Sequence, residues 1–302
     1  MLVEDRHIAA IEAYMTRRWG NARRLTAYVR EVWADYRTLC VDDLDQVVTQ
    51  LTNDDEQFWQ RLWEMQLGSH LFRLGHSTKS PSKGPDFRFD ADGLTIWVEA
   101  TSPAPRGIPA AWFAFPETGV GTSYDTPNDE MLLRWTGAFS EKRRKFDGYA
   151  RDGTTAPGDA CVIAINGGQL SGFWPTPCGV SQMPWAVEIV FPVGPRYAEF
   201  SRGSDEVRWG QAERHGIAKR NGKTVELYPF ITPDCSGISA LVTCVDGCLP
   251  GGGLQLYVAH NPLAAVPIPP GIFGDTAEEW EAVPIEGVSG EFSLRRSRGA
   301  AV

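Results

Sequence analysis

The sequence predicts a mixed α/β domain with an N-terminal helical layer and a strand-rich C-terminal part, and three observations support this. The first 75 residues show helical spacing of apolar positions and contain no proline. After Gly75, short runs rich in β-branched and aromatic residues alternate with glycine and proline, which is typical of strands and turns. The 302 residues are 42% apolar and 22% charged, a composition that excludes disordered and fibrous chains.

Four helices are expected in the first part of the chain. The cluster Asn53, Asp54 and Asp55 supplies N-cap residues for the longest of them, and Gly75 marks its end. The expected ranges are about 5–18, 21–38, 42–52 and 55–74.

A hairpin is expected next. DFRFD (86–90) and LTIWVEAT (94–101) are joined by a tight turn at Ala91-Asp92-Gly93, so the two strands should pair antiparallel. Residues 102–128 contain five prolines and predict an irregular insertion before a helix at about 129–151. Further strands are expected at 160–166, 185–193, 224–232, 239–245 and 254–260, and the chain after about 284 is expected to be weakly ordered.

No internal repeat or low-complexity linker divides the chain, so one domain with three parts is expected. These are a helical layer (1–54), a central core (55–166) and a strand-rich C-terminal part packed on the same domain (167–302). No run approaches the roughly 18 apolar residues of a membrane span, and the acidic N-terminus lacks a signal pattern. We therefore expect a cytoplasmic protein with no membrane partner, whose six cysteines, none in a CxxC pair, are reduced core residues.

The net charge of −9 disfavours a nonspecific nucleic-acid coat, but the basic residues are unevenly spread. Residues 17–30 hold five arginines and no acid, and residues 134–151 hold six basic residues against two acids. The segment 208–223 holds six basic residues, counting His215. A local basic face can bind a polyanion on a chain that is acidic overall, although an ordinary solvated face explains each run equally well.

Three carboxylates have apolar neighbours. Glu64 is the only formally charged residue between Leu62 and Phe72, on a helix that is apolar on nearly every side. A buried carboxylate needs a cation, a hydrogen-bond network or a raised pKa; the alternative is a place at the helix rim in contact with water. Asp86 and Glu99 lie on the two hairpin strands, where facing carboxylates repel unless a divalent cation lies between them. Ligation by oxygen alone favours Mg²⁺ or Mn²⁺ over zinc.

Lys142 occupies an apolar stripe of the helix expected at 129–151, and its neighbours Arg143, Arg144 and Lys145 lie off that stripe. A lysine that faces the sheet between aromatic rings needs an anionic partner, which the carboxylates supply. The alternative is a lysine that extends past the stripe to solvent. The stripe consists of Leu132, Trp135, Phe139, Phe146 and Tyr149.

Glu64 on a helix, followed by GPDF at 84–87 and WVEAT at 97–101, resembles the PD-(D/E)xK nuclease superfamily, the fold of many restriction endonucleases. The resemblance implies a restriction-endonuclease-like core of helix, three strands, helix and strand within residues 55–166. Asp86 then matches the motif aspartate.

Glu99 matches the second acid of that motif, but Thr101 stands where the motif lysine is expected. Some members of the superfamily carry this lysine on the following helix, and Lys142 lies where such a lysine would be expected.

The resemblance implies a nuclease that uses Mg²⁺ or Mn²⁺ to hydrolyse phosphodiester bonds, with DNA as the expected substrate. Asp86, Glu99 and the backbone carbonyl of Ala100 would hold the metal. Lys142 would orient the attacking water or stabilise charge on the phosphate, and Glu64 would assist a second ion or a metal-bound water. Substrate phosphates are expected at Arg143, Arg144 and Lys145.

Two other readings stay open. The chain is a noncatalytic nucleic-acid or protein binding module that retains the nuclease-like fold, which Thr101 and the charge of −9 favour. Or it is an unrelated α/β protein in which GPDF and WVEAT are coincidental, and this reading fails if Glu64, Asp86 and Glu99 converge. The sequence also leaves open whether the chain forms a homo-oligomer.

Overall fold

The computed structural model describes residues 5–20, 23–39, 44–81, 83–114, 125–172, 176–200, 207–245, 254–285 and 291–298. Asp54 caps the helix that carries Glu64, because its carboxylate accepts a hydrogen bond from the backbone N–H of Gln57 at 2.8 Å. The chain leaves this helix through Gly75, whose φ of 85° suits glycine. The four expected helices are confirmed as α1 (Arg6–Trp19), α2 (Arg23–Leu39), α3 (Leu44–Leu51) and α4 (Asp55–Arg73).

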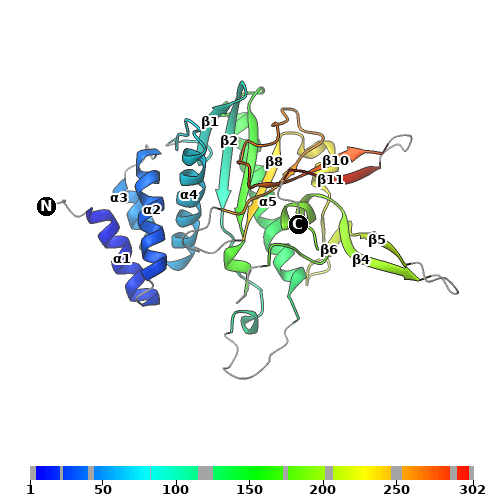
Figure 1. Cartoon of the computed structure of the whole chain (residues 1–302), viewed down its shortest axis with the longest axis horizontal. Coiled ribbons are helices and arrows are strands. Elements are labelled where there is room, and N and C mark those ends of the chain that lie inside the picture. The colour runs from blue at the N-terminus through cyan, green and yellow to red at the C-terminus, as the bar shows by residue number, and fades with distance from the viewer. Residues whose placement is uncertain are drawn as a thin grey trace.

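A seven-stranded mixed sheet forms the centre of the molecule (Figure 1). Its first four strands in spatial order are β1 (Phe87–Ala91), β2 (Leu94–Thr101), β3 (Ala160–Asn166) and β8 (Ala240–Cys244). β1 is antiparallel to β2, whereas β2, β3 and β8 are parallel to one another. The remaining strands are β9 (Tyr257–His260), β10 (Glu278–Pro284) and β11 (Phe292–Arg298). The mixed α/β class predicted from the sequence is therefore confirmed.

Helices cover both faces of the sheet (Figure 1). α4 lies between the sheet and the outer layer formed by α1, α2 and α3, which explains why it is apolar on nearly every side. α5 (Asn128–Arg151) and α6 (Trp185–Val190) lie on the other face. Because strand side chains alternate, Val98 and Ala100 of β2 join the core on the α4 side, and Trp97 joins the core on the α5 side. Glu99 therefore faces α5.

The turn of the first hairpin sets the pairing of its two strands. Both turn residues, 92–93, have positive φ, 50° and 77°, which is the backbone of a two-residue type I′ hairpin turn. The resulting register pairs Phe87 with Val98. Asp86 and Glu99, each one residue beyond that pair, therefore lie opposite each other at the open end of the hairpin.

Three strands are expected between α4 and α5. Among the described residues this region contains the strands β1 and β2 and one isolated β-bridge. Lys79 pairs antiparallel with Arg88, and each backbone N–H donates to the carbonyl oxygen of the other residue at 2.8 Å. Pro81, two residues later, has no N–H with which to continue this ladder. The first of the three expected strands is thus reduced to a single pair.

The strand expected at 185–193 is wrong. Trp185–Val190 forms α6, and the extended chain begins only at Val193 in β4 (Val193–Phe200). Every residue of α6 is buried, and a short apolar run buried on all sides has no periodicity that distinguishes a helix from a strand. Pro184 precedes the helix, a position that proline tolerates.

The C-terminal part differs from the sequence prediction in further places. Within residues 224–232 the strand is limited to the short β7 (Thr224–Glu226), which pairs with β6 (Gly216–Ala218). β4 pairs with β5 (Val207–Glu213) in a ribbon that the sequence does not predict and that extends from the body of the molecule (Figure 1). β11 pairs with β10, so weak order after residue 284 is wrong for residues 291–298. Short 3₁₀ helices lie at Ala110–Phe113, Gly168–Leu170, Pro229–Ile231 and Pro233–Cys235.

Two expectations concern the whole chain. None of the described helices is long and apolar enough to cross a membrane. Among the described residues, four cysteines form no disulfide: Cys161, Cys235 and Cys244 are buried, and Cys178 is half-buried. Cys40, Cys248 and residues 115–124 of the expected insertion lie outside the described residues.

Candidate functional site

Glu64 lies in the buried middle of α4, with 3% of the residue exposed. Its carboxylate accepts hydrogen bonds from the Arg61 guanidinium and from Gln60 Nε2, the latter at 2.9 Å. Arg61 and Gln60 precede Glu64 by three and four residues, so the helix itself places all three side chains on one face. These contacts supply the cation and the hydrogen bonds that a buried carboxylate requires, and Glu64 is not at the helix rim.

Asp86 lies at the start of β1 and is partly buried. Its Oδ2 accepts a hydrogen bond from the backbone N–H of Ala100 at 2.7 Å, and no described residue donates to its Oδ1. Burial raises the pKa of Asp86 well above its usual range, and the negative charges of Glu64 and Glu99 raise it further. The three carboxylates therefore lie close enough together for their charges to interact.

Glu99 is buried on β2, with 2% of the residue exposed, and three donors from α5 surround it. Lys142 Nζ lies 2.9 Å and Lys145 Nζ 2.8 Å from its Oε1. The Tyr149 hydroxyl donates to Oε2 at 3.3 Å. Because these donors are spaced by three and four residues, one face of α5 presents all of them to a single carboxylate.

The two lysines differ in their access to water. The side chain of Lys142 is 7% exposed and that of Lys145 is 45% exposed. Burial alone would lower the pKa of Lys145, but its hydrogen bond to Glu99 and the charge of Glu99 raise that pKa above its ordinary value. Burial and the charge of Glu99 raise the pKa of Tyr149 to about 12, so its hydroxyl remains a donor at neutral pH.

Lys142 lies on the apolar stripe of α5 and faces the sheet rather than solvent. Lys145, which the sequence analysis places off that stripe, also reaches Glu99, because it lies three residues after Lys142 on the same face of α5. Its contact with substrate phosphate stays a prediction.

Gln60 links α4 to the end of β2. Its Nε2 donates to the Ala100 carbonyl at 3.2 Å, and its Oε1 accepts from the Ser102 backbone N–H at 2.8 Å. A cleft of about 430 Å³ opens beside this link, and both Thr101 and Lys142 line it. A molecule that enters this cleft therefore approaches the end of β2 and the α5 lysine together.

The structure does not bring the other predicted substrate contacts to the carboxylates. Arg143 is half-buried and lies beside the Cys235 thiol. Arg144 is exposed, and its Nε donates to the carbonyl of Ser140 on the same helix at 3.3 Å. In the described structure, Lys145 is the member of the predicted basic trio that reaches the site.

The two other basic segments contain ion pairs. Arg18 NH2 lies 2.7 Å from Asp55 Oδ2, and Arg30 pairs with Glu12. Arg214, in the segment 208–223, pairs with Asp129 at 2.6 Å. Part of their charge therefore balances acids of the same chain.

Sequence reasoning missed Gln60, Arg61 and the role of Tyr149 as a donor. Helical spacing is the signal that was available for each of them. Gln60 and Arg61 lie one turn before Glu64, and Tyr149 lies two turns after Lys142.

The oxygen atoms near Asp86 are of the kind that a hard divalent cation prefers as ligands. Asp86 and Glu99 place two carboxylates beside the Ala100 carbonyl, and oxygen donors of this kind suit Mg²⁺ or Mn²⁺. Among the described residues, no group of three or more histidine, cysteine, aspartate or glutamate side chains has the spacing of a metal site. The pairing of Glu64 with Arg61 is consistent with this, because it removes one of the three carboxylates from the possible ligands.

Comparisons of the chain with family models, with curated proteins and with solved structures find no match. Any functional proposal therefore rests on the geometry around Glu64, Asp86, Glu99 and Lys142.

Proposed function

We propose that the chain is a metal-dependent nuclease that hydrolyses phosphodiester bonds, with DNA as its substrate. The observation that carries this proposal is the convergence of three carboxylates and a buried lysine beside an open cleft. Raised carboxylate pKa values caused by like charges are typical of functional sites, because repulsion of this kind costs stability. Such a site is unexpected if these residues served only the stability of the fold.

The same proposal extends to the fold. In chain order, α4, the Lys79 bridge, β1, β2, α5 and β3 correspond to helix, three strands, helix and strand. This is the order of a restriction-endonuclease-like core. β2 and β3 are parallel with α5 as the crossover between them, which places Glu99 of β2 beside the lysines of α5.

In this proposal Asp86, Glu99 and the Ala100 carbonyl hold Mg²⁺ or Mn²⁺. The bound ion would polarise the scissile phosphate and lower the pKa of an attacking water. Glu64, through its repulsion of the Asp86 carboxylate, favours the binding of a cation there.

Lys142 provides a fixed positive charge at the site. Its ammonium is held by Glu99 inside the fold, so its position is set before substrate binds. Charge that develops on the phosphate would be stabilised by Lys142, and Lys145, which is more exposed, would contact the incoming backbone. Arg144, exposed on the same helix, is a further proposed contact to phosphate, with the half-buried Arg143 beside it.

Charge arithmetic supports an anionic substrate. Glu64, Asp86 and Glu99 contribute three negative charges when ionised, and Arg61, Lys142 and Lys145 contribute three positive charges. A divalent cation added to this neutral set gives the site a net positive charge. A phosphodiester would then be attracted even though the chain as a whole carries −9.

One observation favours a second candidate, a noncatalytic binding module of the same fold. Both Glu99 oxygens are bound by protein donors, Oε1 by two lysines and Oε2 by Tyr149. Thr101 occupies the position of the motif lysine. A site whose second acid is held in this way would bind a polyanion without turning it over.

The experiment that tests the proposal compares wild type with Asp86→Asn on linear duplex, circular duplex and single-stranded DNA and on RNA, in Mg²⁺, in Mn²⁺ and in chelator. We expect metal-dependent cleavage of DNA by wild type and none by the variant. Asp90→Asn is the matched control, because Asp90 lies on the same strand but is exposed. Binding without cleavage in all conditions would favour the noncatalytic module.

A further inference from the structure

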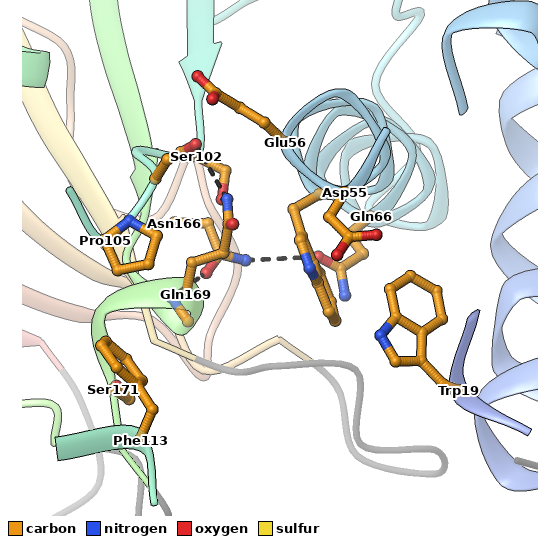
Figure 2. Close-up of a pocket in the computed structure, with 13 residues that line it drawn as sticks. Trp19, Asp55, Glu56, Gln66, Ser102, Pro105, Phe113, Asn166, Gln169 and Ser171 are labelled. Atoms are coloured by element: carbon orange, nitrogen blue, oxygen red, sulfur yellow. Dashed lines mark hydrogen bonds between the residues drawn. The ribbon is translucent and has the colours of Figure 1, made fainter. Parts of the chain in front are cut away.

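A second cavity, of about 630 Å³, lies between α4 and the ends of β2 and β3. Its size is within the range of small-molecule sites, roughly 300–1,000 Å³. Figure 2 shows Trp19, Asp55 and Gln66 on the helical side and Ser102 and Gln169 across the cavity from them. Nothing in the proposed hydrolysis uses this space.

Aromatic rings form part of the wall. Trp19 and Trp59 lie with their ring centroids 5.7 Å apart at an interplanar angle of 49°, and Phe113 lines the other side. All three are only half-buried, so ring surface remains available to a ligand. A flat heterocycle gains by stacking on such rings.

Amide and hydroxyl groups line the same cavity. Asn166 Nδ2 donates to Gln66 Oε1 at 3.4 Å, and Gln169 Nε2 donates to the Ser102 Oγ at 3.1 Å. No described residue donates to Gln169 Oε1, and Ser171 Oγ is buried without a hydrogen-bond partner. Buried polar atoms are normally paired, so a ligand with donors and acceptors along one edge is favoured here.

The charges of the lining disfavour an anion. Asp55 and Glu56 are the charged residues among the described residues that line the cavity, and this described lining contains no lysine, arginine or histidine. Asp55 is already paired with Arg18 and Glu56 with Arg106. A neutral ligand therefore fits better than a phosphate or than a free cation.

The cavity adjoins the proposed hydrolytic site. Ser102 and Glu56 line both this cavity and the cleft that contains Lys142. Ser102 is three residues beyond Glu99 on the same chain segment, a distance of about 10 Å in an extended strand. A strand whose phosphate lies at Glu99 could thus place a neighbouring base in the cavity.

We propose that this cavity binds one nucleobase of the substrate strand, unpaired or extruded from a duplex, by stacking on Trp59 and by hydrogen bonds to Gln169. This inference rests on the proposed nuclease function for the identity of the ligand. A nucleobase is flat, neutral and carries donors and acceptors on one edge. The rings favour a flat ligand, the amides favour an edge of donors and acceptors, and the lack of cations in the described lining favours a neutral ligand.

The test measures binding without cleavage. The full chain with Asp86→Asn, in chelator, is titrated with a single-stranded DNA oligonucleotide and with an abasic oligonucleotide of equal length, which keeps the phosphates and lacks the bases. We expect the base-containing strand to bind about 5- to 150-fold more tightly. Adding Trp59→Ala should remove this difference, and adding Gln169→Met should reduce discrimination among oligonucleotides of different bases.

The control is Trp209→Ala, which removes an exposed tryptophan from the β4–β5 ribbon and should leave the difference unchanged. Free deoxynucleosides form a separate arm; if they bind as tightly as the oligonucleotide, the site is for a small molecule and the strand proposal is overturned. Equal binding of the two strands by the Asp86→Asn protein would also overturn it. If wild type fails to cleave DNA while the base-dependent difference persists and requires Trp59, the nuclease proposal fails and the base site stands.

Discussion

Lys142 of α5 and Glu99 of β2 form a buried ion pair, with Nζ and Oε1 2.9 Å apart and side chains 7% and 2% exposed. Lys145 contacts the same oxygen from the more exposed side. Glu99 is therefore neutralised by two cations that differ in burial. Removal of each cation should have different consequences.

Lys142→Met should reduce DNA cleavage by about 10²–10³-fold or more, because it removes the fixed positive charge at the site. It should also lower the free energy of unfolding, although by less than the roughly 3–5 kcal/mol of an uncompensated buried charge, since Lys145 still pairs with Glu99. Cleavage rates and urea unfolding measure the two effects. Lys145→Met should lose less activity and weaken DNA binding in a salt-dependent way. Equal loss of activity in the two variants would show that Lys142 has no special role.

Asp86→Asn should change how stability depends on pH. Because the folded-state pKa of Asp86 is raised above its ordinary value of 3.8, the folded protein holds this proton when the unfolded chain has lost it. The contribution of Asp86 to the free energy of unfolding should therefore fall as pH rises above about 4 and level off above the folded-state pKa, by at most about 1.4 kcal/mol per pH unit. The variant should lack this decrease. Urea unfolding from pH 4 to pH 8 measures this pH dependence in both proteins. Free energies of unfolding that change equally with pH in wild type and Asp86→Asn would contradict a raised pKa at Asp86.

Metal should stabilise the folded wild type. Binding of Mn²⁺ at a hundredfold excess over its dissociation constant should add about 2.7 kcal/mol, seen as a melting temperature that rises with metal concentration. Asp86→Asn should melt higher than wild type in chelator, because it removes the repulsion, and should respond little to Mn²⁺. Glu99→Gln should also respond little. An equal response of wild type and Asp86→Asn would place the metal elsewhere.

Glu64→Gln should shift the pH profile of wild type toward lower pH. Glu64 is the carboxylate that most strongly raises the pKa of Asp86, so its neutralisation lowers that pKa. The variant should also lose about 1–3 kcal/mol of stability, because Arg61 loses its charged partner. The pH dependence of unfolding and of cleavage measures both. Glu56→Gln, on the exposed face of the same helix, is the control and should leave the profile in place.

Gly167→Ala should destabilise the fold at the end of β3. A Cβ there would overlap the ring of Trp135, which is buried in the core on the α5 side. The expected cost is about 1–3 kcal/mol. Gly158→Ala, where a Cβ meets nothing within 4 Å, is the matched control, and urea unfolding compares the two. Similar stability in both variants would mean that Trp135 has room to move.

The N-terminal helices and the first hairpin could be predicted because their signals are local. Asp54 caps α4, and a tight turn with Gly93 joins β1 to β2. The run 185–193 could not be assigned, because α6 is buried on all sides and its apolar residues carry no period. Strand β11 could not be predicted because its side chains are largely exposed, so its sequence resembles that of an irregular polar segment.

At the candidate site, burial of Glu64 and the position of Lys142 followed from the apolar surroundings of each residue. The contact of Lys145 with Glu99 did not, because the apolar stripe passes through Lys142 and carries no signal that a polar residue three positions later reaches the same carboxylate. The second cavity could not be predicted at all. It depends on how α4 packs against the ends of β2 and β3, which no local pattern encodes.

The two-residue turn at 92–93 has a consequence for the distant end of the hairpin. Strand side chains alternate between the two faces of the sheet. One residue inserted into or deleted from the turn would therefore shift the register of β2 against β1, and the shifted side chains of β2 would point to the opposite face. Glu99, about 20 Å along the strand from the turn, would then point toward α4, and an apolar neighbour would meet Lys142. The length of this loop is therefore a constraint on the chemistry, even though the loop touches none of the reacting groups.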